Sequence, residues 1–271
     1  MRPPAQLAAE PFSRQRRRKL HSQAQAGFAD AGFLHAAMVE EVAARVMALG
    51  RPFARVLDLG GPASAWPGAV RVALAPGDGV VLVADEDRLP FADASFDLVV
   101  SIAGLASVSD LPGALLQARR VLAPDGLFIA CIAGGLTLGE LREDLIRAEA
   151  ALTDRVAPRL APMVEAQAAA GLLGRAGFVM PVADSERVQV RYAGLPGLLA
   201  DLTAMGARSP LAARSPLRRD VLAEAVLRFA DRAADDGKVA VTVDLIHLAG
   251  WAPGTPPGLE SALSQAIGRA L

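Results

Sequence analysis

The sequence predicts an α/β protein organised around a mostly parallel sheet. Three short runs rich in Val, Leu and Ile lie at residues 80–84, 96–100 and 127–132, and a turn and one helical pattern separate them. Consecutive buried strands of a parallel sheet look like this, because both faces are covered and the apolar run is nearly continuous. We therefore expect three neighbouring strands in this stretch, with the rest of the chain packed around them.

The composition is that of an ordinary globular protein. The chain has 271 residues, of which 52% are hydrophobic and 21% charged, so it can bury one sizeable core in one elaborated domain. Its net charge of −1 provides no overall attraction to nucleic acid or anionic lipid. Cys131 is the only cysteine, which excludes an intrachain disulfide and fits a reducing compartment. No apolar leader opens the chain and no run is long enough to cross a bilayer, so we expect a cytoplasmic protein without a membrane span.

Two helices are expected before the first strand. The segment from Arg14 to Lys19 carries five positive charges in six residues, and these charges could bind phosphates or an acidic partner. We favour a solvated helix face, because no aromatic side chain is interleaved with the charges. Residues 33–49 have apolar side chains every four positions, which predicts an amphipathic helix that caps the sheet. The apolar stripe of this helix consists of Leu34, Met38, Val42 and Val46.

The first strand, at residues 55–59, ends in Gly60 and Gly61. Glycines at this position let a cofactor approach the backbone, because they have no side chain to collide with it. Only about twenty residues separate Gly60 from Val80, whereas one parallel crossover with a helix needs a dozen or more. We therefore expect a second strand over residues 69–74 and the loss of one of the two connecting helices. No acidic residue directly follows that strand, although a carboxylate there would suit the two hydroxyls of a ribose.

The central stretch also carries a family resemblance. Asp85 follows a strand, and three motifs come after it: Leu-Pro-Phe at 89–91, Ser-Phe-Asp-Leu-Val-Val at 95–100 and Arg-Val-Leu-Ala-Pro-Asp-Gly at 120–126. In this order and spacing they resemble the second half of a class I S-adenosylmethionine-dependent methyltransferase of the type 11-like group.

A narrower resemblance covers most of residues 12–253. It is carried by further segments at residues 134–142, 176–184, 190–192, 201–206 and 248–253. These segments are similar to the methyltransferase-like assembly factors of respiratory complex I and lie near the biotin-pathway malonyl-carrier-protein O-methyltransferases. The resemblance implies a Rossmann-like, mostly parallel, seven-stranded sheet, in full or reduced form.

The same resemblance implies a division of the chain. A tail and cap helices would occupy residues 1–50, and a methyltransferase-like α/β domain would occupy residues 51–253. A helical insertion at about 195–235 would precede the last strand, and residues 254–271 would form a C-terminal tail.

The resemblance further implies S-adenosyl-L-methionine as the cofactor. The residues expected to bind it are Asp58, Gly60, Gly61, Asp85, Glu86 and Ser101. Asp85 would accept a hydrogen bond from the adenine amino group, and capping of the next turn is its alternative role. Glu86 and Asp87 more often face solvent at such a position, so Glu86 is the member of this set expected to be exposed.

No residue pattern specifies a catalytic group or a metal site. His21, His35 and His247 are isolated from one another and from cysteines, so we expect structural roles for them. Methyl transfer from a sulfonium mainly requires positioning and exclusion of water, and no general base is obligatory. Two roles are open for Arg142, Arg191 and Tyr192. They either shape a pocket for the methyl acceptor or are ordinary packing or surface residues.

Two classes of function remain open. The chain is either a methyltransferase-like enzyme of unknown acceptor, with a protein as one option, or an assembly and binding module whose cofactor site has degenerated. The shortened segment after Gly60 and the missing ribose acid favour the module, and the intact stretch from Asp85 to Gly126 favours the enzyme. The expected partner is a protein substrate or a respiratory-complex subunit, and nucleic acid is not expected.

Overall fold

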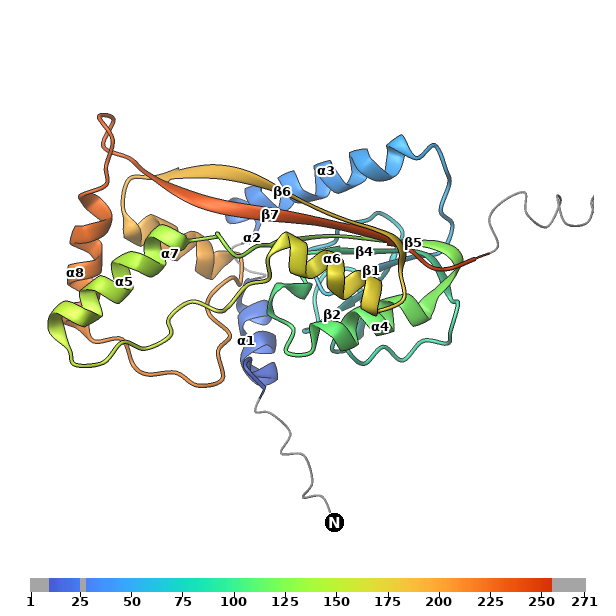
Figure 1. The fold of residues 1–271 in the computed structure, drawn as a ribbon, viewed down its shortest axis with the longest axis horizontal. Helices are drawn as coiled ribbons and strands as arrows, with labels where there is room; N and C mark the ends of the chain where they lie inside the picture. Colours follow the sequence, from blue (N-terminus) through green and yellow to red (C-terminus); the bar gives the residue numbers. More distant parts are fainter. Residues whose placement is uncertain (1–9, 25–27, 255–271) are drawn as a thin grey trace, which may run out of the picture.

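The computed structural model of the chain describes residues 10–24 and 28–254, and the described residues build one mixed sheet of seven strands in the order β3-β2-β1-β4-β5-β7-β6. All neighbouring strands pair in parallel except β7, which runs antiparallel to both β5 and β6 (Figure 1). The strands are β1 (Val56–Leu59), β2 (Val70–Ala73), β3 (Val80–Val83), β4 (Phe96–Ile102), β5 (Leu122–Ala133), β6 (Val179–Tyr192) and β7 (Val239–Trp251). The predicted mostly parallel, seven-stranded sheet is confirmed.

Helices cover both faces of the sheet. In Figure 1, α3 crosses one face while α4 and α6 lie over the other. The helices are α1 (Arg14–Ala24), α2 (Phe28–Ala31), α3 (Phe33–Ala48), α4 (Leu111–Val121), α5 (Gly139–Leu152), α6 (Ala166–Arg175), α7 (Leu195–Ala204) and α8 (Arg219–Ala230), with a short 3₁₀ turn η1 at Leu105–Ser107. Among the residues that the structure describes, no helix has the length and apolar character needed to cross a membrane.

Three hydrophobic cores follow from this arrangement. One core lies between the sheet and α4 and α6, and a second lies between the opposite face and the Met38, Val42 and Val46 stripe of α3. The stripe predicted from the four-residue spacing is therefore buried as expected. A third core joins α5, α7 and α8 to the far end of β7, where the long β6–β7 ribbon runs beyond the other strands (Figure 1).

The first half of the sheet has lost both of its connecting helices. Residues 60–69 join β1 to β2 and residues 74–79 join β2 to β3, and neither connection contains a helix. The prediction that one helix is missing was therefore too conservative. Arg71 on β2 holds both short connections, because its guanidinium donates to the Asp78 carbonyl and, at 3.3 Å, to the Gly61 carbonyl.

Three further features complete the fold. The Asp110 carboxylate caps α4 by accepting a hydrogen bond of 2.8 Å from the Gly113 amide. Cys131 is fully buried in β5, as a small core residue. Helices α7 and α8 lie in the segment where an insertion was expected. The tails at residues 1–9 and 255–271, about which the sequence also made predictions, lie outside the described residues.

Candidate functional site

A cavity of about 200 Å³ opens where the carboxyl ends of β1, β2 and β4 meet the cap helices and the insertion. Ligands of open α/β sheets bind at this edge, because the loops that follow parallel strands all gather there. The loops contribute Pro62, Leu74, Ala103 and Gly104 to the wall. The helices and the long ribbon contribute mainly apolar side chains, together with Arg17, His21, His35 and Tyr192.

Asp58 and Ser101, two predicted cofactor residues, support this edge from within the sheet. Both are fully buried, and neither lines the cavity. The Asp58 carboxylate accepts a hydrogen bond of 2.7 Å from the Ala65 amide, and burial raises its pKa. The Ser101 hydroxyl donates to the Leu59 carbonyl at 2.7 Å, which ties β4 to the end of β1. In this structure both side chains hold the loops in place.

Gly60 and Gly61 are used for contact between protein loops. Gly60 has φ +82°, and a Cβ there would lie 2.8 Å from a carboxylate oxygen of Glu86. A Cβ on Gly61 would lie 2.6 Å from the Ile102 carbonyl, and one on Gly104 would lie 2.7 Å from the Gly60 carbonyl carbon. The space into which side chains at these positions would project is therefore filled by Glu86, by the end of β4 and by the loop after β1.

Glu86 forms a buried ion pair with Arg17. Its carboxylate accepts hydrogen bonds of 2.8 and 3.1 Å from the Arg17 guanidinium, and the two side chains are 1% and 3% exposed. Arg17 also donates to the Ser107 hydroxyl at 3.0 Å. Burial raises the pKa of Glu86, and the Arg17 guanidinium opposes this rise. The expectation that Glu86 faces solvent was wrong, because Arg17 supplies the counter-charge that lets it be buried.

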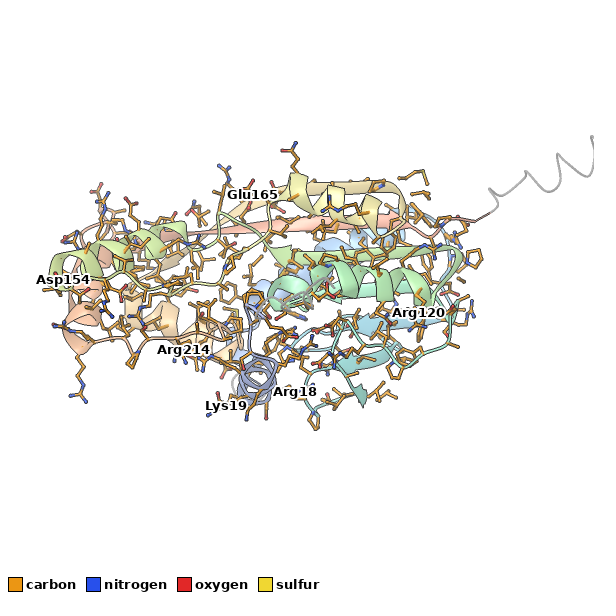
Figure 2. The ribbon with its side chains drawn as sticks, turned by 60° about the horizontal axis from the view of Figure 1, so that its bottom comes forward. Arg18, Lys19, Arg120, Asp154, Glu165 and Arg214 are labelled. Atoms are coloured by element: carbon orange, nitrogen blue, oxygen red, sulfur yellow. The ribbon has the colours of Figure 1, made fainter. Side chains whose placement is uncertain are left out.

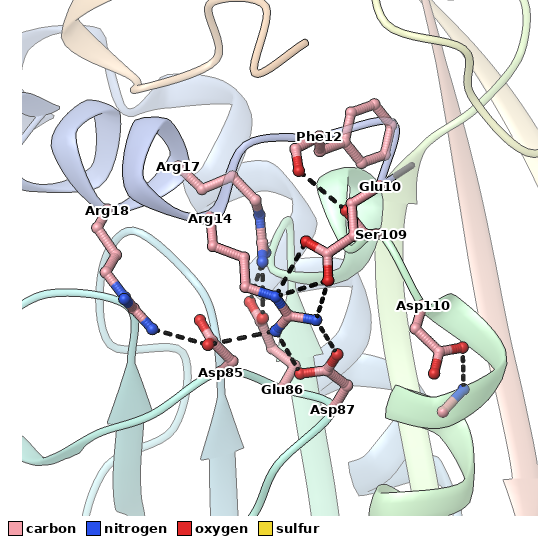
Figure 3. Close-up of polar contacts among 11 residues, drawn as sticks. Glu10, Phe12, Arg14, Arg17, Arg18, Asp85, Glu86, Asp87, Ser109 and Asp110 are labelled. Atoms are coloured by element: carbon pink, nitrogen blue, oxygen red, sulfur yellow. Dashed lines mark hydrogen bonds and ion pairs between the residues drawn. The ribbon is translucent and has the colours of Figure 1, made fainter. Parts of the chain in front are cut away.

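Two more arginines of α1 bind the carboxylates on either side of Glu86 (Figure 3). Arg18 pairs with Asp85 at 2.7 Å, and Arg14 pairs with Asp87 and, at 3.2 Å, with Asp85. The Arg14 guanidinium lowers the pKa of Asp87 by hydrogen bonding to its ionised form. The absence of aromatic residues had suggested that the basic run is a solvated helix face, and this interpretation was wrong. The run is the surface through which α1 docks on the loop after β3.

This docking bears on the adenine contact expected of Asp85. One oxygen of its carboxylate is taken by Arg14 and Arg18, whereas the other oxygen is buried and has no hydrogen-bond partner in the described part of the chain. The end of β2 offers no acid for a ribose, since the buried residues there are Leu74 and Ala75. In the described conformation the residues present therefore do not fit S-adenosyl-L-methionine, although one acceptor atom of Asp85 is left over.

Two histidines that the sequence pattern left as isolated residues lie in the cavity. His21 of α1 and His35 of α3 both line it, and burial together with nearby arginines lowers the pKa of each to about 4. The spacing held a signal, because His35 precedes Met38 by three residues and thus lies on the buried stripe of its helix. The third histidine, His247, is buried elsewhere, with its ring 4.0 Å from the Cys131 sulfur.

The three residues considered for an acceptor pocket have different positions. Tyr192 lines the cavity, and burial and a hydrogen bond with Asp201 raise its pKa. Arg142 donates to the Ala161 carbonyl, and Arg191 pairs with Asp236 at the surface. No group of His, Cys, Asp and Glu suited to a metal ion occurs among the described residues.

The chain is similar in sequence to known proteins. Residues 62–130 match the family described as a methyltransferase domain. The chain is 39% identical over 174 residues to "Arginine-hydroxylase NDUFAF5, mitochondrial" of Danio rerio. The aligned residues make up 64% of this chain and 54% of the relative. The chain is 32% identical over 183 residues to the malonyl-[acyl-carrier protein] O-methyltransferase of Methylovorus sp. (strain MP688), covering 67% of this chain and 60% of the relative.

The similarity to each of these relatives covers about two thirds of this chain. The human protein of the first name is 41% identical over 175 residues, covering 64% of this chain and 50% of the relative. The chain thus spans about half the length of these NDUFAF5 relatives. A solved SAM-dependent methyltransferase of Thermotoga maritima has 14% identity and a TM-score of 0.49, and it matches 89% of this chain and 100% of its own. The family resemblance deduced from the central motifs is confirmed.

Proposed function

We propose that this protein is a methyltransferase-like module that binds a protein partner and whose adenosyl site is closed by its own N-terminal helix. The carrying observation is the buried Arg17–Glu86 pair, with Arg14 and Arg18 on the neighbouring carboxylates. These contacts occupy the rim where the resemblance expects adenine to bind.

Further features support a closed site. Both helices after β1 and β2 are absent, so no helix begins behind the glycine loop to direct its amides at a carboxylate. A side chain at Gly60 would collide with Glu86 and one at Gly61 with the Ile102 carbonyl, so protein atoms already pack against these glycines. Among the lining residues that the structure describes there is no Asp or Glu, whereas the sulfonium of S-adenosyl-L-methionine is a cation.

The relatives support a protein as the partner. The name of the malonyl-[acyl-carrier protein] O-methyltransferases contains a substrate attached to a carrier protein. The name of the NDUFAF5 relatives contains an amino acid, arginine. The sequence resemblance suggests a respiratory-complex subunit. The compartment we propose from the sequence is the cytoplasm, although the name of the NDUFAF5 relatives contains the word mitochondrial.

Calorimetric titration of the full chain with S-adenosyl-L-methionine and S-adenosylhomocysteine tests the closed site. We expect no heat of binding for either ligand at concentrations up to a millimolar. Binding in the low micromolar range that is lost in Asp85→Ala would contradict the proposal and would identify a SAM-dependent enzyme.

A second candidate is a SAM-dependent enzyme that opens when α1 is displaced. The buried and unpartnered oxygen of Asp85 favours it, because a carboxylate that awaits a ligand would have such an atom. The double variant Arg14→Ala/Arg18→Ala frees this carboxylate and leaves the Arg17–Glu86 pair intact. Binding of S-adenosylhomocysteine by this variant, but not by the wild type, would favour the gated enzyme over the closed module.

A further inference from the structure

We propose that the cavity at the carboxyl edge is a binding site for a small amphiphilic anion, with one carboxylate on a short aliphatic body. This inference goes beyond the proposed function, because it assigns a ligand class to the cavity whether or not an adenosyl ligand binds.

The charges of the wall all have one sign. Its cationic side chains are Arg17 and Arg208, its two histidines are uncharged near neutral pH, and no Asp or Glu occurs among the described residues that line it. A cation that entered would leave water without meeting a counter-charge, which is strongly unfavourable. A carboxylate would instead meet no like charge, and the Arg208 guanidinium would be available to it as a counter-charge, because Arg17 is already paired with Glu86. The sign of the wall therefore selects an anion over a cation of the same size.

His35 supplies an unsatisfied polar atom for such a ligand. The residue is only 7% exposed, and its Nε2 has no hydrogen-bond partner among the described residues. The same atom lies 3.7 Å from where a Cβ on Gly61 would be, so it points toward the loop after β1. The ring is held edge-to-face by Phe28, with centroids 5.3 Å apart. Buried polar atoms in folded proteins almost always have a partner, and a ligand oxygen at this position would provide one.

The mouth of the cavity carries uncompensated positive charge. Arg208 lines the cavity and is exposed. Burial lowers the pKa of Arg16, and the positive charges of Arg214 and Arg208 lower it further, so both guanidiniums lie near that of Arg16. Arg16 donates to the Ser209 carbonyl, and none of the three forms a salt bridge within the described parts of the chain. Figure 2 shows Arg214 in the segment next to α1, which carries Lys19. This potential would attract anions to the opening.

The volume and the apolar wall limit the rest of the ligand. A cavity of about 150 Å³ lined by aliphatic and aromatic side chains holds one benzene molecule, which has six heavy atoms. By that ratio, about 200 Å³ accommodates roughly eight heavy atoms. Leu20, Met38 and Leu202 provide an apolar surface for such a body. Hexanoate, with its six carbons and two oxygens, is therefore the first probe.

Calorimetry or ligand-observed NMR of the full chain with hexanoate, hexylammonium and hexanol tests the assignment. We expect hexanoate to bind at least tenfold more tightly than hexylammonium and more tightly than hexanol. His35→Phe keeps an aromatic side chain but removes the ring nitrogens, and it should weaken hexanoate binding at least fivefold. The matched control is His247→Phe, a buried histidine outside the cavity, which should leave hexanoate binding unchanged.

Arg208→Ala provides a second test that does not depend on core packing, because this side chain is exposed. It should weaken hexanoate and reduce the salt dependence of binding. The assignment is overturned if hexylammonium or hexanol binds as well as hexanoate. It is equally overturned if hexanoate does not bind, or if both His35→Phe and Arg208→Ala bind it like the wild type. None of these outcomes depends on S-adenosyl-L-methionine, so the proposed function stands or falls separately.

Discussion

Replacement of Arg17 by Met tests whether the docking of α1 depends on one buried charge pair. The substitution keeps most of the aliphatic length and removes two hydrogen bonds to Glu86 and one to Ser107. Glu86 is 1% exposed, so its carboxylate would be left without a counter-charge and without access to water. Breaking a buried pair from one side typically costs about 3–5 kcal/mol of unfolding free energy. We expect Arg17→Met to lose an amount in that range at neutral pH.

Urea-induced unfolding of the full chain, followed by circular dichroism, measures this loss. The control is Arg18→Ala, because the Arg18 side chain is 48% exposed and its pair with Asp85 should contribute at most about 1 kcal/mol. The double variant Arg17→Met/Glu86→Leu should recover most of the stability, since both charges are then removed together. A loss below about 1 kcal/mol in Arg17→Met, or no recovery in the double variant, would refute the reasoning.

The same variant has a pH signature of known sign. Burial raises the pKa of Glu86, and Arg17 is the group that opposes this, so removal of Arg17 raises the folded-state pKa further. A carboxyl whose pKa is higher in the folded than in the unfolded state takes up a proton on folding as the pH falls. The stability difference between wild type and Arg17→Met should therefore shrink as the pH is lowered from 7. A difference that grows toward acid pH would contradict this assignment.

Three further outcomes are expected. Gly61→Ala should cost about 1–3 kcal/mol in urea unfolding, because its Cβ would meet a backbone oxygen at 2.6 Å, whereas Gly139→Ala, with open space around it, should not destabilise the protein. Asp110→Ala should cost about 1 kcal/mol by removing the N-cap of α4, and Asp110→Asn should retain most of it; equal losses would argue against capping. Burial raises the pKa of the Cys131 thiol to about 12, so at pH 8 roughly one thiol in ten thousand is ionised. A disulfide reagent should therefore label it only after unfolding, and rapid labelling of the native protein would show that it is accessible.

Much of the fold could be predicted because local sequence patterns specify its strands and the buried face of α3. The apolar runs around Val80, Leu98 and Leu127 are strands, and the four-residue spacing of Met38 and Val42 marks the buried face of α3. The chain length after Gly60 correctly indicated a missing crossover. It could not show that both helices were lost, because a strand connection of six residues is rare enough that sequence reasoning assigns it a helix or a longer loop.

The candidate site was less predictable. Asp58 and Ser101 were expected at a cofactor, and they brace the sheet edge from within. The sequence predicted that Arg17 belongs to a solvated helix face. A run of charges does not show which residues from other parts of the chain pack against it. His35 was read as isolated, although its position on the helix stripe indicated burial.

Periodicity, turn residues and segment lengths were sufficient to specify the class of sheet and the cap helix, since each depends on residues that are close in sequence. The insertion was expected from the family resemblance. The pairing of Arg17 with Glu86 joins residues 69 positions apart, and only the folded chain brings them together. A run of arginines can face solvent or can pair with a row of carboxylates from another part of the chain. The local sequence is the same in both cases, so it does not distinguish them. The tertiary structure decides between them because burial removes water and makes every charge depend on the groups around it.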